Sequence, residues 1–527
     1  MTNIKIKIYF LILIILIIYS FNNALNIGLS WDELFHYLNG KVRFNYLTSL
    51  GQNKEYNFSN NIYYPGFYDT LTYSLANLIK LIAPNFFKDH FDQIIHIVNL
   101  LFSISSIYGL YSLVKLFLNK ETAIISSLFT FINPFFFGHS AINPKDIIIF
   151  FSLVWFLYFL LKFLKKFKYK HLILMSFFAG MGCGIRLSFI GIIIPIFILT
   201  FIYLLKQKKK FRIKEYASYI STILFIINFI ILSTWPHVID GGIKIYFDTI
   251  INSFNWSDVP FYGFINGEIY EIKNTPLDYF LKFMVYRMPF YSTFLLILGF
   301  ILSIIYKEKL VNIYGNQIIT KIILILFIII FPIFLAILLR VNLYDNIRLF
   351  IFILPFISII NAIFFIMLIK LIKTKNFIKI NFLIFLFLFT IFIYRFISLA
   401  PFQYSYINYT FINLENTNGK FEHDYWNTSF KHLVSKLEDK YTIKEIKRMK
   451  FSWCGGNANV LGFYLNKKYK ITKLFSPQYA DYILMTNRGL FKKNVNEKTC
   501  FEKYKGKNIV EINKNGMILS VLRKINN

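Results

Sequence analysis

The sequence predicts a polytopic α-helical membrane protein that ends in a small α/β domain. Of its 527 residues, 56% are hydrophobic and only 16% are charged, and the mean hydropathy is +0.52. About one quarter of the residues of a typical soluble chain are charged. Apolar runs long enough to cross a bilayer recur through the first three quarters of the chain, and a polar segment of different composition follows them.

About eleven apolar runs are predicted to be transmembrane helices, which together form a membrane domain over residues 1–397. The first run has no small-residue cleavage site after it, so it is interpreted as an uncleaved helix rather than a signal peptide. The stretch 171–205 is long enough for two helices, broken near Gly182–Arg186. The predicted spans are 8–27, 93–117, 122–138, 147–162, two within 171–205, 216–235, 289–306, 319–339, 347–370 and 380–397.

The charges of the connecting loops predict the orientation of the helices. Basic loops such as 162–170 and 206–214 fall on the same side as the N-terminus, which the positive-inside rule assigns to the cytoplasm. Much of the net charge of +31 is therefore expected to orient helices and face anionic lipid, and a nucleic-acid partner is not expected. An odd number of spans places the tail outside. The predicted outer loops are mixed in charge or contain acidic residues: 28–92, 139–146, 236–288 and 340–346.

Residues 398–527 are predicted to form a small extracytoplasmic α/β domain. Short β-like runs alternate with turn signals, and a helix-like stretch covers about 428–449. Cys454 and Cys500 could form a disulfide in an exported domain, although spacing alone does not fix the geometry. The three cysteines include no CxxC spacing, so a cysteine zinc site is not expected.

Two acidic clusters lie in predicted outer loops. Asp32 and Glu33 directly follow the first span, where a carboxylate could take the proton of an acceptor hydroxyl. The alternative is a solvated pair at a helix start, because acidic residues favour the first turn. His139 opens the loop HSAINPKD, which ends with Lys145 and Asp146. A carboxylate beside a cation suits an ionic leaving group and a polar acceptor, and the alternative is a polar hairpin between two helices.

Arginines in the predicted spans and loops are candidates for binding phosphate. Arg186 lies in an apolar run, where an arginine is costly and usually faces a protein interior or water. Its forked donors match phosphate oxygens, and the alternative is an arginine that snorkels to the interface. Arg340 and Arg348 lie on either side of Tyr344 at an outer membrane face and could hold a phosphate leaving group. The alternative for Arg348 is a helix-start pair with Asp345.

Two further polar sites lie at the end of a predicted span and at the start of the outer domain. His237 ends a span at the outer face, and a lone histidine is more often structural than functional. The run FEHDYW at 421–426 is predicted to pack the tail against the membrane domain. Five of the six clusters fall at one surface, on a topology predicted from other residues, and the sixth opens the outer domain. The sequence therefore predicts an active site on the outer face of the membrane.

The order of these motifs resembles the GT-C superfamily of glycosyltransferases. An acidic pair after the first helix, a large first outer loop, a second acidic site in the next outer loop and about eleven spans carry the resemblance. The closer similarity is to the bacterial protein O-mannosyltransferase-like branch, which includes the aminoarabinose transferases. The similar segments are YYPGFYDTL, HSAINPKD, GCGIRL, LYDNIRLFIFILP, PFQYSYIN and FEHDYWNTS. The small tail, in place of the sugar-binding or repeat modules of some relatives, leaves the class of acceptor open.

The resemblance implies an inverting transferase that uses a polyprenyl-phosphate sugar on the extracytoplasmic side of a bacterial inner (plasma) membrane. Asp32 would be the general base, Glu33 would support it, and Asp146 would be a second catalytic acidic residue. The acceptor would be a protein, lipid or glycan. Some members need a divalent metal and others do not; Asp32, Glu33 and Asp146 are the ligand candidates if one is needed. The implied contacts to the donor phosphate are Lys145, Arg186, Arg340 and Arg348, and the candidate substrate-binding residues are Tyr64, His139, His237 and Tyr344.

Two other functions are weighed against this one. A lipid-linked glycan polymerase or ligase would also use arginines in outer loops, but it does not call for an acidic pair directly after the first span. A lipid or sugar transporter would carry ionisable residues near the bilayer midplane, and the predicted spans are nearly free of them. Both comparisons favour a membrane glycosyltransferase.

Overall fold

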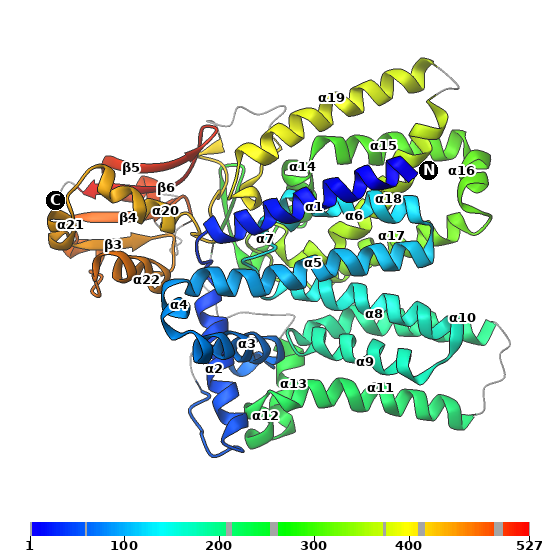
Figure 1. Cartoon of the computed structure of the whole chain (residues 1–527), viewed down its shortest axis with the longest axis horizontal. Helices are drawn as coiled ribbons and strands as arrows, with labels where there is room; N and C mark the ends of the chain where they lie inside the picture. Colours follow the sequence, from blue (N-terminus) through cyan, green and yellow to red (C-terminus); the bar gives the residue numbers. More distant parts are fainter. Residues whose placement is uncertain are drawn as a thin grey trace.

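The computed structural model describes residues 3–57, 61–206, 213–252, 262–372, 376–408, 417–489 and 499–525. A bundle of long helices carries, at one end, a domain of four strands and short helices formed by the C-terminal part of the chain (Figure 1). The N-terminus lies at the opposite end of the bundle (Figure 1). This is the arrangement expected when an odd number of helices runs from one end of the bundle to the other. Most of the predicted basic loop 206–214 lies outside the described residues.

Helices form at all eleven positions predicted to cross the membrane. Eight stretches within the described residues are long and apolar enough to span a bilayer, and a ninth counts if α14 and α15, which meet at a bend of 108°, form one span. The remaining two, α6 and α9, are apolar but have only 12 and 15 residues. The eleven helices are α1 (Asn3–Asn26), α5 (Phe91–Phe117), α6 (Lys120–Phe131), α8 (Asp146–Lys166), α9 (Tyr169–Cys183), α10 (Ile190–Lys206), α11 (Ile213–Ser233), α15 (Phe290–Ile305), α17 (Ile318–Leu338), α18 (Leu354–Leu371) and α19 (Asn376–Ser398).

The helices differ in how much of their apolar surface is covered by protein. α8 and α18 are mostly buried in the centre of the bundle. α11 and α17 instead expose large side chains such as Phe225 and Ile323. An apolar side chain facing lipid tails needs no protein cover, whereas the backbone polar groups must be satisfied within the helix. The chain is therefore a multi-span membrane protein.

Shorter elements connect the long helices. Most of them gather at the end of the bundle that carries the C-terminal domain, whereas α16 lies at the other end (Figure 1). These elements are α2 (Glu33–Thr48), η1 (Asn61–Tyr63), α3 (Phe67–Ile82), α4 (Pro84–Asp89), α7 (Pro134–His139), η2 (Leu187–Phe189), α12 (Pro236–Gly241), α13 (Ile243–Asn252), β1 (Tyr262–Ile265), β2 (Glu268–Glu271), η3 (Ile272–Asn274), α14 (Tyr279–Arg287), α16 (Lys307–Tyr314), η4 (Arg348–Ile353) and η5 (Gln403–Ser405).

The buried Arg43 organises the long segment between α1 and α5. Its guanidinium donates to the carbonyl oxygens of Asn61 at 3.0 Å and Thr234 at 2.8 Å. Gly66 lies against this side chain: its φ is +80°, and a Cβ there would come within 2.3 Å of the Arg43 Nε. The glycine of YYPGFYDTL is therefore needed both for its left-handed backbone and for the close approach of Arg43. These contacts hold the segment against the end of α11.

The C-terminal domain is an α/β sheet domain, as predicted. Its strand order is β3-β4-β6-β5, in which β3 and β4 are parallel and the other pairs antiparallel. The predicted β-like runs form β4, β5 and β6, whereas the four-residue β3 was not predicted. The elements are α20 (Phe430–Ser435), η7 (Lys436–Asp439), α21 (Ile443–Arg448), β3 (Phe451–Cys454), α22 (Ala458–Tyr469), η8 (Pro477–Tyr479), β4 (Tyr482–Thr486), α23 (Cys500–Lys503), β5 (Gly506–Lys514) and β6 (Met517–Ile525).

Two local features of this domain refine the sequence interpretation. The single helix expected over 428–449 is wrong, because α20 passes into the turn η7 and a new helix begins at Ile443. Thr442 and Glu445 form a capping box, in which each side chain accepts from the other residue's backbone N–H, and this fixes a helix start. Cys454 and Cys500 form the disulfide whose geometry the sequence left open.

Candidate active site

Asp32 lies where the chain turns from α1 into α2, at the end of the bundle that carries the C-terminal domain. Its backbone carbonyl accepts the first hydrogen bond of α2, from the N–H of His36 at 3.0 Å. The Ser30 N–H donates to the Glu33 carboxylate at 2.6 Å, and the Ser30 hydroxyl donates to the carbonyl of Ile142 at 2.9 Å. These bonds fix the turn and bring Asp32 beside the 139–146 loop.

The 139–146 loop is shaped by Asn143. Its side-chain oxygen accepts from the backbone N–H groups of Lys145 at 3.1 Å and Asp146 at 2.9 Å, and its amide donates to the Asp146 carboxylate at 3.0 Å. An asparagine that bonds the backbone two residues on is a usual way to close a tight turn. The turn aims the Lys145 ammonium at Asp32, with Nζ 3.0 Å from Oδ2. The same ammonium lies 5.4 Å from the centre of the Tyr64 ring.

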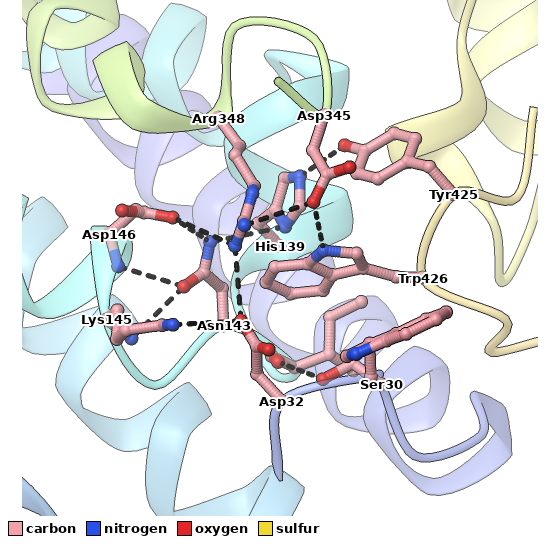
Figure 2. Close-up of polar contacts among 12 residues, drawn as sticks. Ser30, Asp32, His139, Asn143, Lys145, Asp146, Asp345, Arg348, Tyr425 and Trp426 are labelled. Carbon is pink, nitrogen blue, oxygen red and sulfur yellow. Dashed lines mark hydrogen bonds and ion pairs between the residues drawn. The ribbon is translucent and has the colours of Figure 1, made fainter. Parts of the chain in front are cut away.

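Arg348 lies at the centre of the site (Figure 2). One terminal nitrogen, Nη1, is 3.3 Å from Oδ2 of Asp32 and 3.8 Å from Oδ2 of Asp146. The other, Nη2, is 3.0 Å from Oδ2 of Asp345, so the alternative interpretation of an Asp345–Arg348 pair also holds. The guanidinium stacks on the Tyr344 ring at 4.9 Å. Arg348 therefore links three carboxylates from three separate segments.

Arg186 joins the site from the break between α9 and α10. The glycines of GMGCGIR end α9 at Cys183, and a Cβ at Gly182 would come within 2.4 Å of the Phe189 ring. The chain breaks where the sequence predicted, and Arg186 becomes extended. Its Nη2 is 3.4 Å from Oδ1 of Asp146, and 22% of its side chain is exposed. The arginine therefore reaches the cluster while keeping one side open.

A cavity of about 180 Å³ lies beside Arg186. Its polar wall includes Tyr64, Arg186 and Tyr344, and its apolar wall comes from α10, α17 and η4. The apolar residues include Ile192, Pro332, Leu335, Leu349, Phe350 and Phe352. A cavity with a cation at one side and an apolar wall at the other suits an amphiphile with an anionic head.

The charged groups of the site form one cluster of seven residues. Three carboxylates and four cations are linked by ion pairs of 2.8–3.8 Å. One positive charge is in excess, which favours an anionic ligand. The charged cluster consists of Asp32, Lys145, Asp146, Arg186, Asp345, Arg348 and Arg488.

The three carboxylates of the charged cluster differ in exposure. The side chain of Asp32 is 20% exposed, against 3% for Asp146 and 5% for Asp345. Burial by itself would raise the pKa of Asp32, but Lys145, Arg348 and His36 together hold that pKa well below its ordinary value. Asp32 is therefore ionised and is the most accessible carboxylate of the three.

Three residues of the site were not singled out from the sequence. Asp345 appeared only as a structural partner, and Trp426 only in a run predicted to pack the tail. The Trp426 indole donates to Oδ2 of Asp345 at 3.2 Å and lies 4.8 Å from the Arg348 guanidinium, so the run does pack as predicted and also contacts the site. Arg488 comes from the turn after β4, and its Nη2 is 2.8 Å from Oδ1 of Asp345. The sequence around Arg488 contains no signal that distinguishes it from other basic residues.

The predicted site residues divide into those within the site and those outside it. His139 is buried at its edge, where Nε2 is 2.7 Å from the Tyr425 hydroxyl, and burial lowers the pKa of His139 to about 3. Glu33 points away, toward His96, with an Nε2–Oε1 distance of 3.2 Å. His237 bonds Asn57 at 3.0 Å and holds the loop between α2 and α3. Arg340 is exposed and lines a second cavity, of about 270 Å³.

Within the part of the chain that the structure describes, the candidate metal ligands do not form a metal site. Across the described ranges, no group of three or more His, Cys, Asp or Glu side chains is arranged to hold an ion. Asp32 and Asp146 are each paired with cations, and Glu33 is turned toward His96. The three ligand candidates therefore do not converge on one point.

Part of the chain matches the model of a known protein family. Residues 76–235 match the family model described as dolichyl-phosphate-mannose-protein mannosyltransferase. This range contains the 139–146 loop and Arg186. No curated protein matches the chain by sequence. The match agrees with the resemblance that the motifs carry: over these residues, the chain is similar to a family of membrane glycosyltransferases.

Several solved structures resemble the structure of this chain at low sequence identity. ArnT from Cupriavidus metallidurans bound to undecaprenyl phosphate has 9% identity and a TM-score of 0.49, over 99% of this chain and 98% of that one. The apo state of the same protein has 10% identity and a TM-score of 0.48, over 88% and 84%. The archaeal oligosaccharyltransferase AglB from Archaeoglobus fulgidus, in complex with an inhibitory peptide and a dolichol-phosphate, has 11% identity and a TM-score of 0.46, over 92% and 70%.

Proposed function

We propose that the chain transfers a sugar from a polyprenyl-phosphate-linked donor to the hydroxyl of an extracytoplasmic protein, lipid or glycan, with inversion at the anomeric carbon. The observation that carries the proposal is that Asp32, the most accessible carboxylate, is paired with both Lys145 and Arg348. This pair of cations lies next to the cavity beside Arg186, which has a polar wall and an apolar wall. In this proposal residues 1–397 form the domain in the bacterial inner membrane, with a cytoplasmic N-terminus. Residues 398–527 form the extracytoplasmic domain.

The donor class is supported by the family match and by the cavity. The description of the matching family names dolichyl-phosphate-mannose, in which a sugar is carried on a polyprenyl phosphate. In the cavity, Arg186 would contact the phosphate, and the apolar wall formed by α10 and α17 would contact the first isoprene units. Tyr64 and Tyr344 line the same cavity near the cations and are placed to contact the sugar or the phosphate.

The reaction proposed is a single displacement. The acceptor oxygen attacks the anomeric carbon from the face opposite the phosphate and forms the new glycosidic bond. The bond from the anomeric carbon to the phosphate oxygen breaks, and the electron pair leaves with the polyprenyl phosphate. The proton of the acceptor hydroxyl goes to Asp32. Lys145, Arg186 and Arg348 stabilise the charge that develops on the leaving phosphate.

The low pKa of Asp32 implies that the donor binds before Asp32 acts as a base. With Lys145 and Arg348 at 3.0 and 3.3 Å, the carboxylate is ionised but a weak proton acceptor. A donor phosphate that binds the same two cations draws them away from Asp32. The carboxylate then loses part of its counter-charge, and its pKa rises toward the ordinary value. Binding of the donor would thereby turn Asp32 into a better base.

The experiment that tests the proposal measures transfer of radiolabelled sugar from a panel of polyprenyl-phosphate sugars by purified protein in nanodiscs, with native membrane extract as acceptor. We expect Asp32→Asn to lower transfer by about 10²- to 10⁴-fold, which is the range for removal of a general base. Asp240→Asn is a matched control, because Asp240 is an ion-paired, 24% exposed carboxylate outside the charged cluster. It should keep wild-type transfer.

Each other outcome selects a different function. Equal transfer by folded wild-type and Asp32→Asn proteins would remove Asp32 from catalysis. Transfer of a whole lipid-linked oligosaccharide, and not of single sugars, would indicate a polymerase or ligase. Movement of the lipid across vesicles without any transfer would indicate a transporter.

A further inference from the structure

Arg488 brings the C-terminal domain into contact with the candidate active site. It lies in the turn after β4, and only 7% of its side chain is exposed. Its Nη1 donates to the carbonyl of Tyr425 at 2.6 Å, and its Nη2 pairs with Asp345 at 2.8 Å. The guanidinium also lies over the ring of Trp31, the neighbour of Asp32, at 4.9 Å. The side chain is therefore held from three directions.

Asp345 lies between Arg488 and Arg348 and pairs with both of them. Its Oδ1 faces Arg488, and its Oδ2 faces both Nη2 of Arg348 at 3.0 Å and the Trp426 indole N–H at 3.2 Å. The backbone of Asp345 has a φ of +54°, in the left-handed region that aspartate tolerates better than most residues. Both carboxylate oxygens are thus committed to defined donors.

The contacts of Asp345 determine which terminal nitrogen of Arg348 is directed at Asp32. The Tyr344 and Trp426 rings lie 4.9 and 4.8 Å from the guanidinium, and Asp345 takes Nη2. Nη1 is left directed at Asp32 and Asp146 (Figure 2). Two parallel N–H···O bonds between an arginine and a carboxylate are stronger than one. If Asp345 lost Arg488, it would be free to turn both oxygens toward Arg348 and draw Nη1 away from Asp32.

We infer that Arg488 is a positioning residue of the transferase: through Asp345 it holds Nη1 of Arg348 where the leaving phosphate would be. The role rests on the proposed function. Arg488 does not contact the reacting atoms in this scheme. It orients Arg348 and adds one positive charge to the charged cluster, so the C-terminal domain is part of the active site rather than an appendage to it.

The C-terminal domain is built to hold Arg488 in place. The carbonyl of Arg488 accepts from the N–H of Cys500 at 3.2 Å, and Cys500 is tied by the disulfide to the end of β3. The Thr486 hydroxyl donates to the carbonyl of Gly455 in the loop that follows β3. In that loop the Asn457 amide donates to the carbonyl of Trp31 at 2.9 Å. Two loops of one cross-linked domain therefore contact the Trp31–Asp32 turn and Asp345 together.

The test compares wild type, Arg488→Gln and Arg488→Lys in steady-state transfer and in binding of a sugar-free polyprenyl phosphate. The lipid phosphate resembles the leaving group after charge has developed, so it reports contacts that strengthen during the reaction. For Arg488→Gln we expect kcat to fall by about 10- to 100-fold, the donor KM to change less than about threefold, and the lipid-phosphate affinity to fall by about tenfold. Arg488→Lys keeps the charge and should recover at least part of each loss.

Arg523→Gln is the matched control. Arg523 lies on β6 of the same domain and bonds Asn508 and the carbonyl of Phe501, away from the charged cluster. It should lower the melting temperature at least as much as Arg488→Gln while leaving kcat unchanged. The double variant Arg488→Gln/Asp345→Asn should be as active as the less active of the two single variants. Both substitutions interrupt the same chain of contacts to Arg348, so their effects should not add.

The failures of the two proposals are distinguishable. An active wild type whose Arg488→Gln variant has unchanged kcat and lipid-phosphate affinity would overturn the positioning role alone. Loss of activity that tracks the melting temperature equally in Arg488→Gln and Arg523→Gln would also overturn it. A wild type that neither transfers sugar nor binds the lipid phosphate would overturn the proposed function, and the role of Arg488 with it.

Discussion

Asp32 and Glu33 are neighbours in the chain with different surroundings. Asp32 is the residue before α2 and Glu33 is its first residue, and their side chains point to different partners. Asp32 faces Lys145 and Arg348 and is partly exposed. Glu33 is 1% exposed, accepts from the Ser30 N–H and pairs with His96. Glu33 therefore supports the turn that carries Asp32, and the geometry gives it no direct contact with the charged cluster.

Glu33→Gln is expected to lower the stability of the fold and to leave the rate of transfer nearly unchanged. The substitution leaves His96 in a buried site without its anionic partner, and breaking a buried pair costs about 3–5 kcal/mol. The amide oxygen of the substituted side chain can still accept from the Ser30 N–H, so the turn should form in the molecules that fold. The melting temperature in detergent should drop, while kcat per folded molecule should stay within about threefold of wild type. A variant that melts like wild type but has lost transfer would instead put Glu33 in the chemistry.

At the scale of elements, the β1–β2 hairpin contacts the run FEHDYW, and this run in turn contacts the turn after β4. Ile265 pairs with Phe421 as an isolated bridge, and the N–H of Gly267 donates to the carbonyl of Lys420 at 3.1 Å. The next residue, Glu422, accepts from the N–H of Gly489 at 3.0 Å and is only 7% exposed. Burial raises the pKa of Glu422 to about 7, against the lowering effect of Arg488. This junction therefore contains a carboxyl group that ionises near neutral pH.

Glu422→Gln is expected to stabilise the protein more at pH 8 than at pH 5. The folded-state pKa of about 7 exceeds the unfolded value of about 4.3, so the native state binds more protons between these values and its stability falls as pH rises through them. A neutral glutamine removes that cost, which is about 3–4 kcal/mol at pH 8 and about 1 kcal/mol at pH 5, while still accepting from Gly489. Thermal unfolding at pH 5 and pH 8 checks this. An equal shift at both pH values would mean that ionisation of Glu422 plays no part.

At the scale of the whole molecule, the C-terminal domain is anchored to the bundle by a buried acid at the start of α5. Asp92 is 1% exposed and pairs with Lys431 at 3.0 Å and Lys467 at 3.1 Å. Trp426 is fully buried in the same interface. Because the charged cluster includes Arg488, docking of the domain and assembly of the site depend on each other.

Asp92→Asn should loosen the docked domain. The two lysines, which are 22% and 34% exposed, would lose the buried anion that they share, and this should cost about 1.5–3 kcal/mol, the range for a hydrogen bond to a charged group. Amide hydrogen exchange should become faster in α20 and α22 than in α8, because local opening of the domain becomes easier. Asp278→Asn is the control, because its pair with Lys282 is exposed and contributes at most about 0.5 kcal/mol. Unchanged exchange in α20 and α22 would show that Asp92 does not hold the domain.

The elements that sequence predicted best are those decided by local composition. Eleven apolar runs became eleven helices, because a chain in lipid must satisfy its backbone hydrogen bonds within each segment. The break before Arg186 followed from its glycines, and β4, β5 and β6 from their alternating patterns. The helix over 428–449 failed, because a capping box started a second helix inside it. The strand β3 was missed, because four residues carry too little pattern.

The candidate site combines features that depend on short stretches of chain with contacts that depend on tertiary packing. The sequence by itself determined the membrane class, the helices and the polar residues at their ends, since each depends on a short stretch of chain. Only the tertiary structure decided which of these residues meet: Asp32 and Arg348 are 316 positions apart, and no local pattern brings the turn that carries Arg488 to Asp345. It also turned Glu33 away from the cluster, set Arg340 in another cavity and paired Cys454 with Cys500. Ion pairs depend on distances of a few ångströms between segments, and packing of the whole chain sets those distances.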